Sequence, residues 1–316
     1  MKTEITIGTR GSALALWQAK WVQSRLHEIF PETSIHLKII KTKGDKILDV
    51  PLAKIGGKGL FVKEIETALL DKEIDLAVHS MKDMPSEMPD GLCLGAITKR
   101  ENPRDVLISR NGSDLNKMAK TARIGTSSLR RSSQLLHAYP ELQIVPLRGN
   151  LDTRLKKLDS EKLDAIVLAA AGVIRLGLES RISSYFDTSV ILPAVGQGAL
   201  GIEIREDDVL MQQAMDHLDN FETHVCVKSE RAFLNQLEGG CQVPIAAYAT
   251  VTNDTLHLTG MVAGLSGQPL LRDDIYGHPD QADSLGQTLA NNLLARGAKK
   301  ILAQIVDFSP VRALHK

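Results

Sequence analysis

Hydrophobic and polar positions follow two alternating periods along the first two-thirds of the chain. Residues 12–30 place apolar side chains such as Trp17, Trp21 and Leu26 at helical spacing, and Pro31 follows them, so this segment predicts a helix. Shorter apolar runs predict strands over 5–7, 35–40 and 74–78, and a second helix over 60–70. This βα alternation predicts a mostly parallel sheet with helices on both faces.

Two short patterns recur in the same order. Residues 7–12 (IGTRGS) resemble residues 124–128 (IGTSS), and residues 75–78 (DLAV) resemble residues 164–167 (DAIV). We therefore predict two similar α/β lobes, although strand–turn–helix pieces of this size also recur by chance. Two such lobes commonly close on a ligand by a hinge. The candidate crossovers between them are residues 99–104 and 192–198.

The pattern changes after residue 222. A helix is predicted over 225–237, followed by three strand-like runs joined by short turns and then a helix over 282–296. This indicates a small α+β domain with a three-stranded antiparallel sheet. The predicted domains are residues 1–98 with 194–218 for the first α/β lobe, residues 99–193 for the second, and residues 219–316 for the third.

Composition and charge exclude several classes of protein. The 38 basic and 38 acidic residues balance, so no global field favours a nucleic acid or a membrane surface as partner. The longest apolar run, residues 165–174, is too short to span a bilayer, and no signal peptide is visible. The three cysteines form no C-x-x-C and no cluster with histidine, which disfavours a metal site or disulfides. We expect a cytoplasmic protein with reduced cysteines.

Cys241 directly follows two glycines at the end of the helix predicted over 225–237. Glycines allow positive φ and a close approach of the backbone to another surface, so this thiol suggests covalent chemistry. The alternative is a helix C-cap followed by a small buried hydrophobic residue. We expect the Cys241 loop to project toward the cleft between the two lobes.

Arginines gather at predicted strand-to-helix turns and in the first turns of helices. In parallel α/β sheets these turns lie at the carboxyl edge, where ligands bind, and the guanidinium fork suits carboxylates or phosphates. One such arginine is ordinarily a solvated charge, but the repetition predicts a substrate with many anionic groups. Serine and threonine at the same helix N-termini add N–H donors and hydroxyls. The residues are Arg10, Ser12, Thr126, Ser127, Ser128, Arg130, Arg131, Arg148, Arg154 and Arg175.

Two further segments are candidates for the site. The Gly- and Lys-rich stretch 43–59 does not have the spacing of a phosphate-binding loop, and is either a mobile surface loop or a lid to which Lys54 adds charge. Lys82 and Asp83 follow a buried strand, where the carboxylate either serves as a general acid–base or caps a turn before Pro85. No histidine is placed as an evident partner for Cys241.

Taken together, these motifs resemble the hydroxymethylbilane synthases, also called porphobilinogen deaminases, over essentially the whole chain. The matching stretches are residues 8–15 (GTRGSALA), 79–83 (HSMKD), 125–131 (GTSSLRR), 148–150 (RGN), 170–177 (AAGVIRLG), 230–234 (ERAFL) and 239–241 (GGC).

The resemblance implies three domains, of which the first two are lobes like those of the periplasmic binding proteins. It implies a dipyrromethane cofactor joined by a thioether to Cys241, stepwise condensation of four porphobilinogen molecules with loss of ammonia, and a monomer. It implies catalytic roles for Asp83 and Lys82. It places Arg130, Arg131, Ser128, Thr126, Ser127, Lys82, Asp83, Phe61 and Gln197 at the cofactor, and Arg10, Ser12, Arg148, Arg154, Arg175 and Lys54 at the substrate carboxylates.

Two other classes compete with this interpretation. A two-lobed receptor for a small anion would use the same arginines without chemistry, but the Gly-Gly-Cys241 stretch argues against it. A transferase with Cys241 as nucleophile lacks an evident histidine partner. A pyrrole adduct that survives denaturation favours the synthase, no adduct favours the receptor, and an acyl adduct labile to hydroxylamine favours the transferase.

Overall fold

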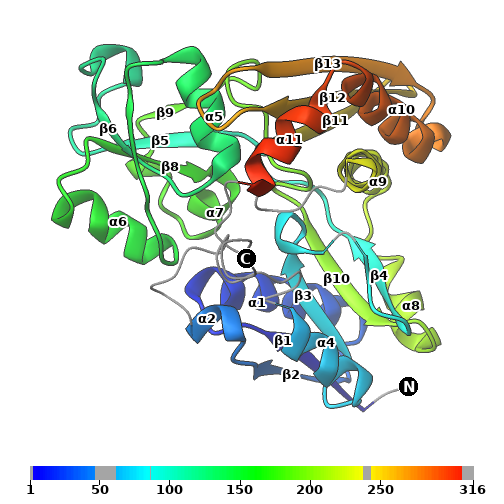
Figure 1. Cartoon of the computed structure of the whole chain (residues 1–316). Helices are drawn as coiled ribbons and strands as arrows, with labels where there is room; N and C mark the ends of the chain where they lie inside the picture. Colours follow the sequence, from blue (N-terminus) through cyan, green and yellow to red (C-terminus); the bar gives the residue numbers. More distant parts are fainter. Residues whose placement is uncertain (1–2, 47–61, 86, 238–242, 308–316) are drawn as a thin grey trace, which may run out of the picture. The chain divides into compact units, whose positions relative to one another are not determined.

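The computed structural model describes residues 3–46, 62–85, 87–237 and 243–307 (Figure 1). The chain divides into two compact units. Within the described residues, the first unit comprises 3–46, 62–85, 87–101 and 198–224, and the second comprises 102–197, 225–237 and 243–307. In this part of the chain, no helix combines the length and apolar character needed to cross a membrane.

The first unit is built on a five-stranded sheet with strand order β2-β1-β3-β10-β4. The helix α1 packs on one face with Ile5, Leu76 and Ile202, whereas α4 packs on the other face with Ile74 and Ala77. The elements are β1 Glu4–Thr9, α1 Ala13–Ile29, β2 Ser34–Ile39, α2 Lys43–Lys46, α4 Lys63–Leu70, β3 Leu76–Ser80, β4 Leu92–Ile97, β10 Leu200–Arg205 and α8 Val209–Met215.

The second unit contains a sheet of the same plan, with strand order β7-β6-β8-β5-β9. The helix α5 packs on one face, and α6 and α7 pack on the other, so both faces are buried. The elements are β5 Asp105–Ser109, β6 Arg123–Gly125, α5 Leu129–Ala138, β7 Gln143–Val145, α6 Leu151–Ser160, β8 Ala165–Ala169, α7 Ala170–Arg175 and β9 Ser184–Tyr185.

Matched hydrogen bonds confirm the predicted repeat. In the first lobe, the Asp75 carboxylate accepts from Thr6 N at 2.8 Å, and Asp75 N donates back to Thr6 O. In the second lobe, Asp164 and Arg123 make the same two bonds, with the carboxylate accepting at 2.7 Å. The aspartates that open residues 75–78 and 164–167 therefore tie equivalent strands together.

A second matched interaction lies at the far end of each sheet. Arg205 at the end of β10 donates to Ile74 O at 2.6 Å, and Arg110 directly after β5 donates to Leu163 O at 2.8 Å. Arg205 also donates to Leu69 O near the end of α4, and Arg110 also donates to Leu158 O near the end of α6. Because the last carbonyls of a helix lack intrahelical partners, both arginines complete a helix C-terminus.

Both sheets are mostly parallel, as predicted, and each contains one antiparallel strand. β1, β2 and β3 are parallel, as are β6, β7 and β8, but β10 and β5 run antiparallel to both of their neighbours. β5 follows the first crossover segment and β10 follows the second. Each therefore runs through its sheet in the direction opposite to the other strands. The sequences of these two strands do not reveal their direction, since strands buried on both faces look alike in either orientation.

The C-terminal region has its own sheet and core, as predicted. Three strands form an antiparallel sheet in the order β11-β12-β13, and helices α9, α10 and α11 bury one of its faces around Phe233 and Leu289. The elements are α9 Phe221–Gln236, β11 Ile245–Thr252, β12 Thr255–Ala263, β13 Leu270–Gly277, α10 Ala282–Ala295 and α11 Ala298–Asp307.

The unit boundaries at 101/102 and 197/198 fall inside the two predicted crossovers, and the boundary at 224/225 falls within α9. The second unit joins the second lobe to the C-terminal sheet. Contacts between them include His137 Nδ1 of α5, which lies 3.0 Å from Gly267 O of the β12–β13 turn. The division into three domains stays a prediction.

Glu230 ties α9 to two other segments of the second unit. Its side chain is fully buried, and its two carboxylate oxygens accept from Gly196 N at 2.7 Å and from Ala249 N at 2.9 Å. One glutamate of α9 therefore satisfies buried donors on the second crossover and on β11. A buried N–H without an acceptor is costly, so this residue carries a large share of the local stability.

We predict that Glu230→Ala lowers the free energy of unfolding by about 3 kcal/mol, because two buried N–H groups lose their acceptor. Glu230→Gln keeps one acceptor oxygen and should cost less. Urea denaturation of the full chain measures both. Glu141→Ala, which removes an exposed glutamate 3.4 Å from Lys120, is the control and should cost less than about 1 kcal/mol. Equal losses for Glu230→Ala and Glu141→Ala would refute the role of Glu230.

Candidate active site

In the first unit, four predicted site residues lie at one edge of the sheet. β1 and β3 are parallel neighbours, so their carboxyl ends meet at the same edge. Arg10 directly follows β1, and Ser12 is the N-cap of α1, with its hydroxyl accepting from Ala15 N at 3.3 Å. Lys82 and Asp83 belong to a single 3-10 turn, η1 Met81–Asp83, which directly follows β3.

The η1 turn is held from three sides. Gln18 of α1 donates to the Ser80 hydroxyl at 2.9 Å, and Met81 N donates to Ala199 O at 3.1 Å. The Met81 side chain is 2% exposed and therefore anchors the turn in the core. Asp83 itself is exposed. The turn thus holds its backbone firmly and presents a carboxylate to solvent.

Asp83 has no hydrogen bond or ion pair with any residue in the described part of the chain. The Asp83 carboxylate therefore does not cap a turn before Pro85, which was the alternative interpretation. A carboxylate without an intramolecular partner remains available to a ligand N–H group or to a proton.

In the second unit, the turns after β6 and β7 lie at the equivalent edge. The hydroxyls of residues 126–128 each accept a backbone N–H: Thr126 from Ser128 N at 3.2 Å, Ser127 from Leu147 N at 2.9 Å, and Ser128 from Arg131 N at 3.4 Å. These bonds order the loop and start α5. At the next turn, Asn150 is the N-cap of α6.

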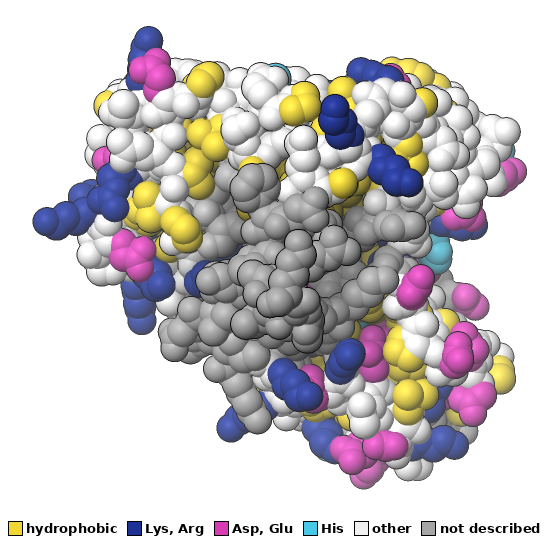
Figure 2. Space-filling model, viewed as in Figure 1, with side chains coloured by type: hydrophobic (Ala, Val, Ile, Leu, Met, Phe, Trp, Pro, Cys, Tyr) yellow, Lys and Arg dark blue, Asp and Glu magenta, His cyan; other side chains and the backbone are white. Residues whose placement is uncertain are grey.

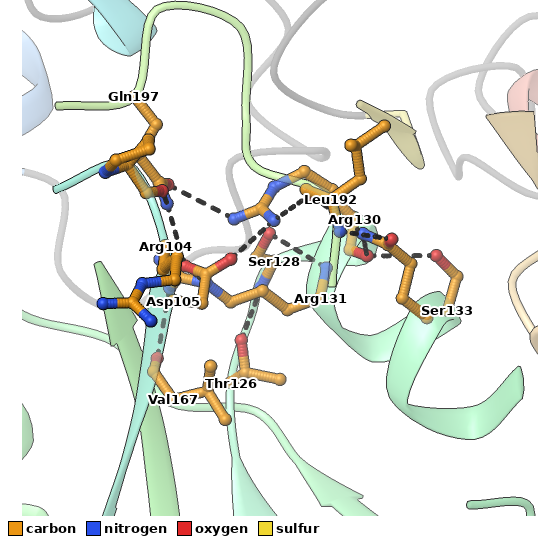
Figure 3. Close-up of polar contacts among 12 residues, drawn as sticks. Arg104, Asp105, Thr126, Ser128, Arg130, Arg131, Ser133, Val167, Leu192 and Gln197 are labelled. Carbon is orange, nitrogen blue, oxygen red and sulfur yellow. Dashed lines mark hydrogen bonds and ion pairs between the residues drawn. The ribbon is translucent and has the colours of Figure 1, made fainter. Parts of the chain in front are cut away.

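Arg130 and Arg131 converge on one buried carboxylate, that of Asp105 (Figure 3). Arg130 Nη1 lies 2.7 Å from Asp105 Oδ2, and Arg131 donates from Nε at 2.9 Å and from Nη2 at 2.8 Å to Oδ1. Gln197 Nε2 also donates to Oδ1 at 3.1 Å and to Pro103 O at 2.6 Å. The carboxylate at the start of β5 therefore joins α5 to the second crossover.

Charge balance explains the ionisation of this cluster. Burial alone raises the pKa of Asp105, but the two guanidiniums outweigh it and hold the pKa at about 2. Burial also lowers the pKa of Arg131, and Asp105 opposes that shift. Two guanidiniums face one carboxylate, so the cluster keeps one excess positive charge beside the N-terminus of α5. That excess favours an anionic ligand there.

The other arginines at this edge differ in exposure. Arg148 and Arg154 are half-buried, and Arg154 Nε donates to Gly149 O at 2.8 Å. Arg175 is 8% exposed and is the last residue of the short helix α7, whereas the sequence pattern places it near a helix start. All three follow parallel strands whose carboxyl ends share one edge.

Three predicted site residues, Cys241, Lys54 and Phe61, lie outside the described residues. The predicted loop over 43–59 begins with the short helix α2, and residues 47–59 also lie outside. Site residues in different units are not placed relative to one another. Among the described residues, no group of three or more His, Cys, Asp or Glu side chains could hold a metal ion.

The histidines that the sequence left unassigned have partners of their own. His79 lies 2.9 Å from Glu203, and His224 lies 2.9 Å from Asp219. Asp105 is the important residue that the sequence analysis missed. Its only signal is an isolated acid at the head of the apolar run Val106–Ile108, where a buried charge requires a counter-ion.

We predict that Asp105→Asn lowers the free energy of unfolding at neutral pH by about 4 kcal/mol, because two buried guanidiniums lose their counter-charge. The folded pKa of about 2 lies below the ordinary pKa of 3.8 for an aspartate, so this contribution is present above about pH 4 and is lost as the pH falls toward 2. Urea denaturation at several pH values measures it. The exposed Asp90→Asn is the control, and a pH-independent difference would contradict the assignment.

Comparison with known proteins covers nearly the whole chain. The family described as "Porphobilinogen deaminase, dipyromethane cofactor binding domain" matches residues 5–213, and "Porphobilinogen deaminase, C-terminal domain" matches residues 224–295. The porphobilinogen deaminase of Syntrophotalea carbinolica is 55% identical over 306 residues, covering 97% of each chain. That of Pelobacter propionicus is 52% identical over 302 residues, covering 96% of this chain and 97% of its own.

Among solved structures, the methionine-binding protein MetQ aligns with 70% of this chain and 92% of its own at 14% identity, with a TM-score of 0.45. The family matches and the relatives at more than half identity agree with each other over nearly the full length. This chain belongs to the porphobilinogen deaminase family.

Proposed function

We propose that Cys241 anchors the cofactor of this enzyme and that Asp83 carries its repeated chemistry. The chain is a hydroxymethylbilane synthase, a transferase that condenses four porphobilinogen molecules stepwise with loss of ammonia and releases a linear hydroxymethylbilane. Its cofactor is dipyrromethane, for which residues 5–213 form the binding domain. The roles of individual residues are our proposal.

The donor set of the second unit fits such a cofactor. Porphobilinogen carries two carboxylates, so a primer and product chain built from it are strongly anionic. The Asp105 cluster keeps one excess positive charge, and α5 and α6 direct their N-termini to the same edge of the sheet. We propose that Arg130 and Arg131, with the hydroxyl-bearing loop Thr126, Ser127 and Ser128, hold the cofactor carboxylates, and that Gln197 and Phe61 lie beside its rings.

Substrate carboxylates require further cations as the chain grows. We propose that Arg10, Ser12, Arg148, Arg154, Arg175 and Lys54 bind them. Guanidinium groups suit this task because they pair with carboxylates in a bidentate fork and stay charged throughout. The bound cofactor supplies a pyrrole carbon nucleophile that extends the chain.

The geometry of Asp83 is the single observation on which the catalytic assignment rests. Its carboxylate is exposed, lacks an intramolecular partner in the described chain, and stands on a turn whose backbone is fixed by Met81 and Ser80. A fixed carboxylate can accept hydrogen bonds from pyrrole N–H groups and stabilise positive charge where it develops. We propose that Asp83 also moves protons between steps, with Lys82 beside it to orient carboxylates.

The Cys241 thiol has a different role in this proposal. We propose that Cys241 forms its thioether once, during maturation, and then holds the primer while the far end of the growing chain reacts. The partner that this scheme requires is the small-molecule substrate porphobilinogen. We further propose that the enzyme acts as a monomer in the cytoplasm, without nucleic acid or membrane.

We predict that Cys241→Ser yields a protein without a covalent pyrrole adduct. Intact-mass measurement on the denatured wild type should show the chain plus a dipyrromethane, and the variant should show the bare chain. Cys93→Ser is the matched control and should retain the adduct. An adduct persisting in Cys241→Ser would refute the anchor. A wild type with no adduct would favour a receptor, and a hydroxylamine-labile adduct a thiol transferase.

We predict that Asp83→Asn still binds porphobilinogen but loses turnover by about a hundredfold or more, because the amide can neither take a proton nor stabilise cationic charge. Single-turnover formation of substrate-bound complexes separates binding from chemistry. Asp90→Asn, an exposed aspartate in the same segment, should behave as wild type. Turnover within a few-fold of wild type would remove Asp83 from the mechanism.

A further inference from the structure

Three titratable side chains meet in the interior of the first unit, behind the η1 turn. They are Glu66 of α4, His79 of β3 and Glu203 of β10, with exposed fractions of 7%, 6% and 0%. The mechanism above uses none of them. Buried acids are retained only when hydrogen bonds or counter-charges compensate their desolvation, so this cluster needs an explanation.

The sheet register places His79 and Glu203 on one face, and α4 packs against that face. His79 pairs with Gly201 and Ala77 pairs with Glu203, so the side chains of Ala77, His79 and Glu203 share a face of the sheet. Ala77 packs against α4, the helix that carries Glu66. His79 Nε2 lies 2.9 Å from Glu203 Oε2, which makes the histidine and the carboxylate one hydrogen-bonded pair.

Two carboxylate oxygens of this cluster have no partner. Glu203 Oε1 and Glu66 Oε1 are both buried, and neither has a hydrogen bond to any described residue. Two ionised carboxylates cannot satisfy each other, because each oxygen only accepts. One proton on Glu66 changes this, since its O–H can donate to Glu203 Oε1 and both groups then have a partner.

Electrostatic interactions favour a proton on Glu66. Burial is the main cause that raises the pKa of Glu66, and the negative charge of Glu203 raises it further, while His79 and Lys63 oppose the shift. Arg205, on the same strand as Glu203, is engaged with the carboxylates of Asp75 and Asp208. Cys93 of β4 is a further titratable neighbour of Glu203, and its pKa is raised chiefly by burial.

The cluster is connected directly to the turn that bears Asp83. His79 is the penultimate residue of β3, and η1 begins two residues later at Met81. The partner of His79 in the register, Gly201, has no side chain, and a Cβ there would lie 2.3 Å from the Met81 sulfur. Met81 therefore fills the space beside the His79–Glu203 pair.

We propose that Glu66 carries a proton in the folded protein and donates it to Glu203 Oε1, so that the Glu66–Glu203–His79 chain of hydrogen bonds holds the turn that presents Asp83. Glu66 and Glu203 are then positioning residues, acting on the reaction only through η1. The inference rests on the proposed function for its kinetic consequence, but its protonation part is independent of any activity.

The protonation is tested by the stability of wild type, Glu66→Gln and Glu66→Ala. Because the folded pKa of Glu66 is raised, the wild type loses unfolding free energy as the pH rises from the unfolded value of 4.5 through the folded pKa. Glu66→Gln donates permanently through its amide, so relative to wild type it should gain stability as the pH rises from about 5 to about 8. A difference that is constant with pH would overturn the proposal.

The positioning is tested by steady-state kinetics of the same holoenzymes with porphobilinogen. Glu66→Ala should lower kcat by about tenfold with little change in KM, because a displaced Asp83 impairs chemistry more than binding. Glu66→Gln should restore kcat to within about twofold of wild type. Glu73→Ala, an exposed glutamate paired with Lys38, is the control.

The outcomes separate the two ideas. Equal kcat values for wild type and Glu66→Ala, or equal losses for Glu66→Ala and Glu66→Gln, would overturn the positioning role. If Glu66→Ala does not fold, the Glu66→Gln variant still tests the protonation through its pH-dependent stability. A wild type that forms no product from porphobilinogen would contradict the proposed function and leave the stability result standing.

Discussion

The second lobe and the carboxyl edge of its sheet depend on the ion pairs of the buried Asp105 carboxylate. Two guanidiniums can enter the interior only with a counter-charge, and Asp105 supplies it to Arg130 and Arg131 together. The same carboxylate accepts from Gln197, so the helix start, the antiparallel strand and the crossover share one electrostatic centre. The folding of this lobe and the charge at this edge of its sheet therefore depend on the same carboxylate.

Much of the fold was predictable because amphipathic helices and short apolar strands have clear periods. The repeat was visible in the aspartates Asp75 and Asp164, and the structure gives each the same pair of backbone hydrogen bonds. The reversed direction of β5 and β10 was not predictable, since a strand buried on both faces looks the same in either direction.

The candidate site was predictable at its edges and not in its interior. Arginines and hydroxyls at strand ends are visible in the sequence, as is Asp83 after a buried strand. Asp105 heads an apolar strand, Glu203 lies between two isoleucines, and Glu66 lies in an amphipathic helix. Only three-dimensional pairing shows what each acid does. A single sequence can indicate that a charged residue is buried, but it does not indicate which partner compensates the charge.

The matched arginines Arg110 and Arg205 belong to the part of the structure that the two lobes share. In each lobe the arginine binds carbonyl oxygens at the end of a helix, at the edge of the sheet where the parallel strands begin. At the opposite edge the two lobes differ: aligned through Asp75 and Asp164, the position of Asp83 corresponds to Gly172. The two lobes therefore share one scaffold and differ at the turn after the third parallel strand, which carries a carboxylate in the first lobe and no side chain in the second.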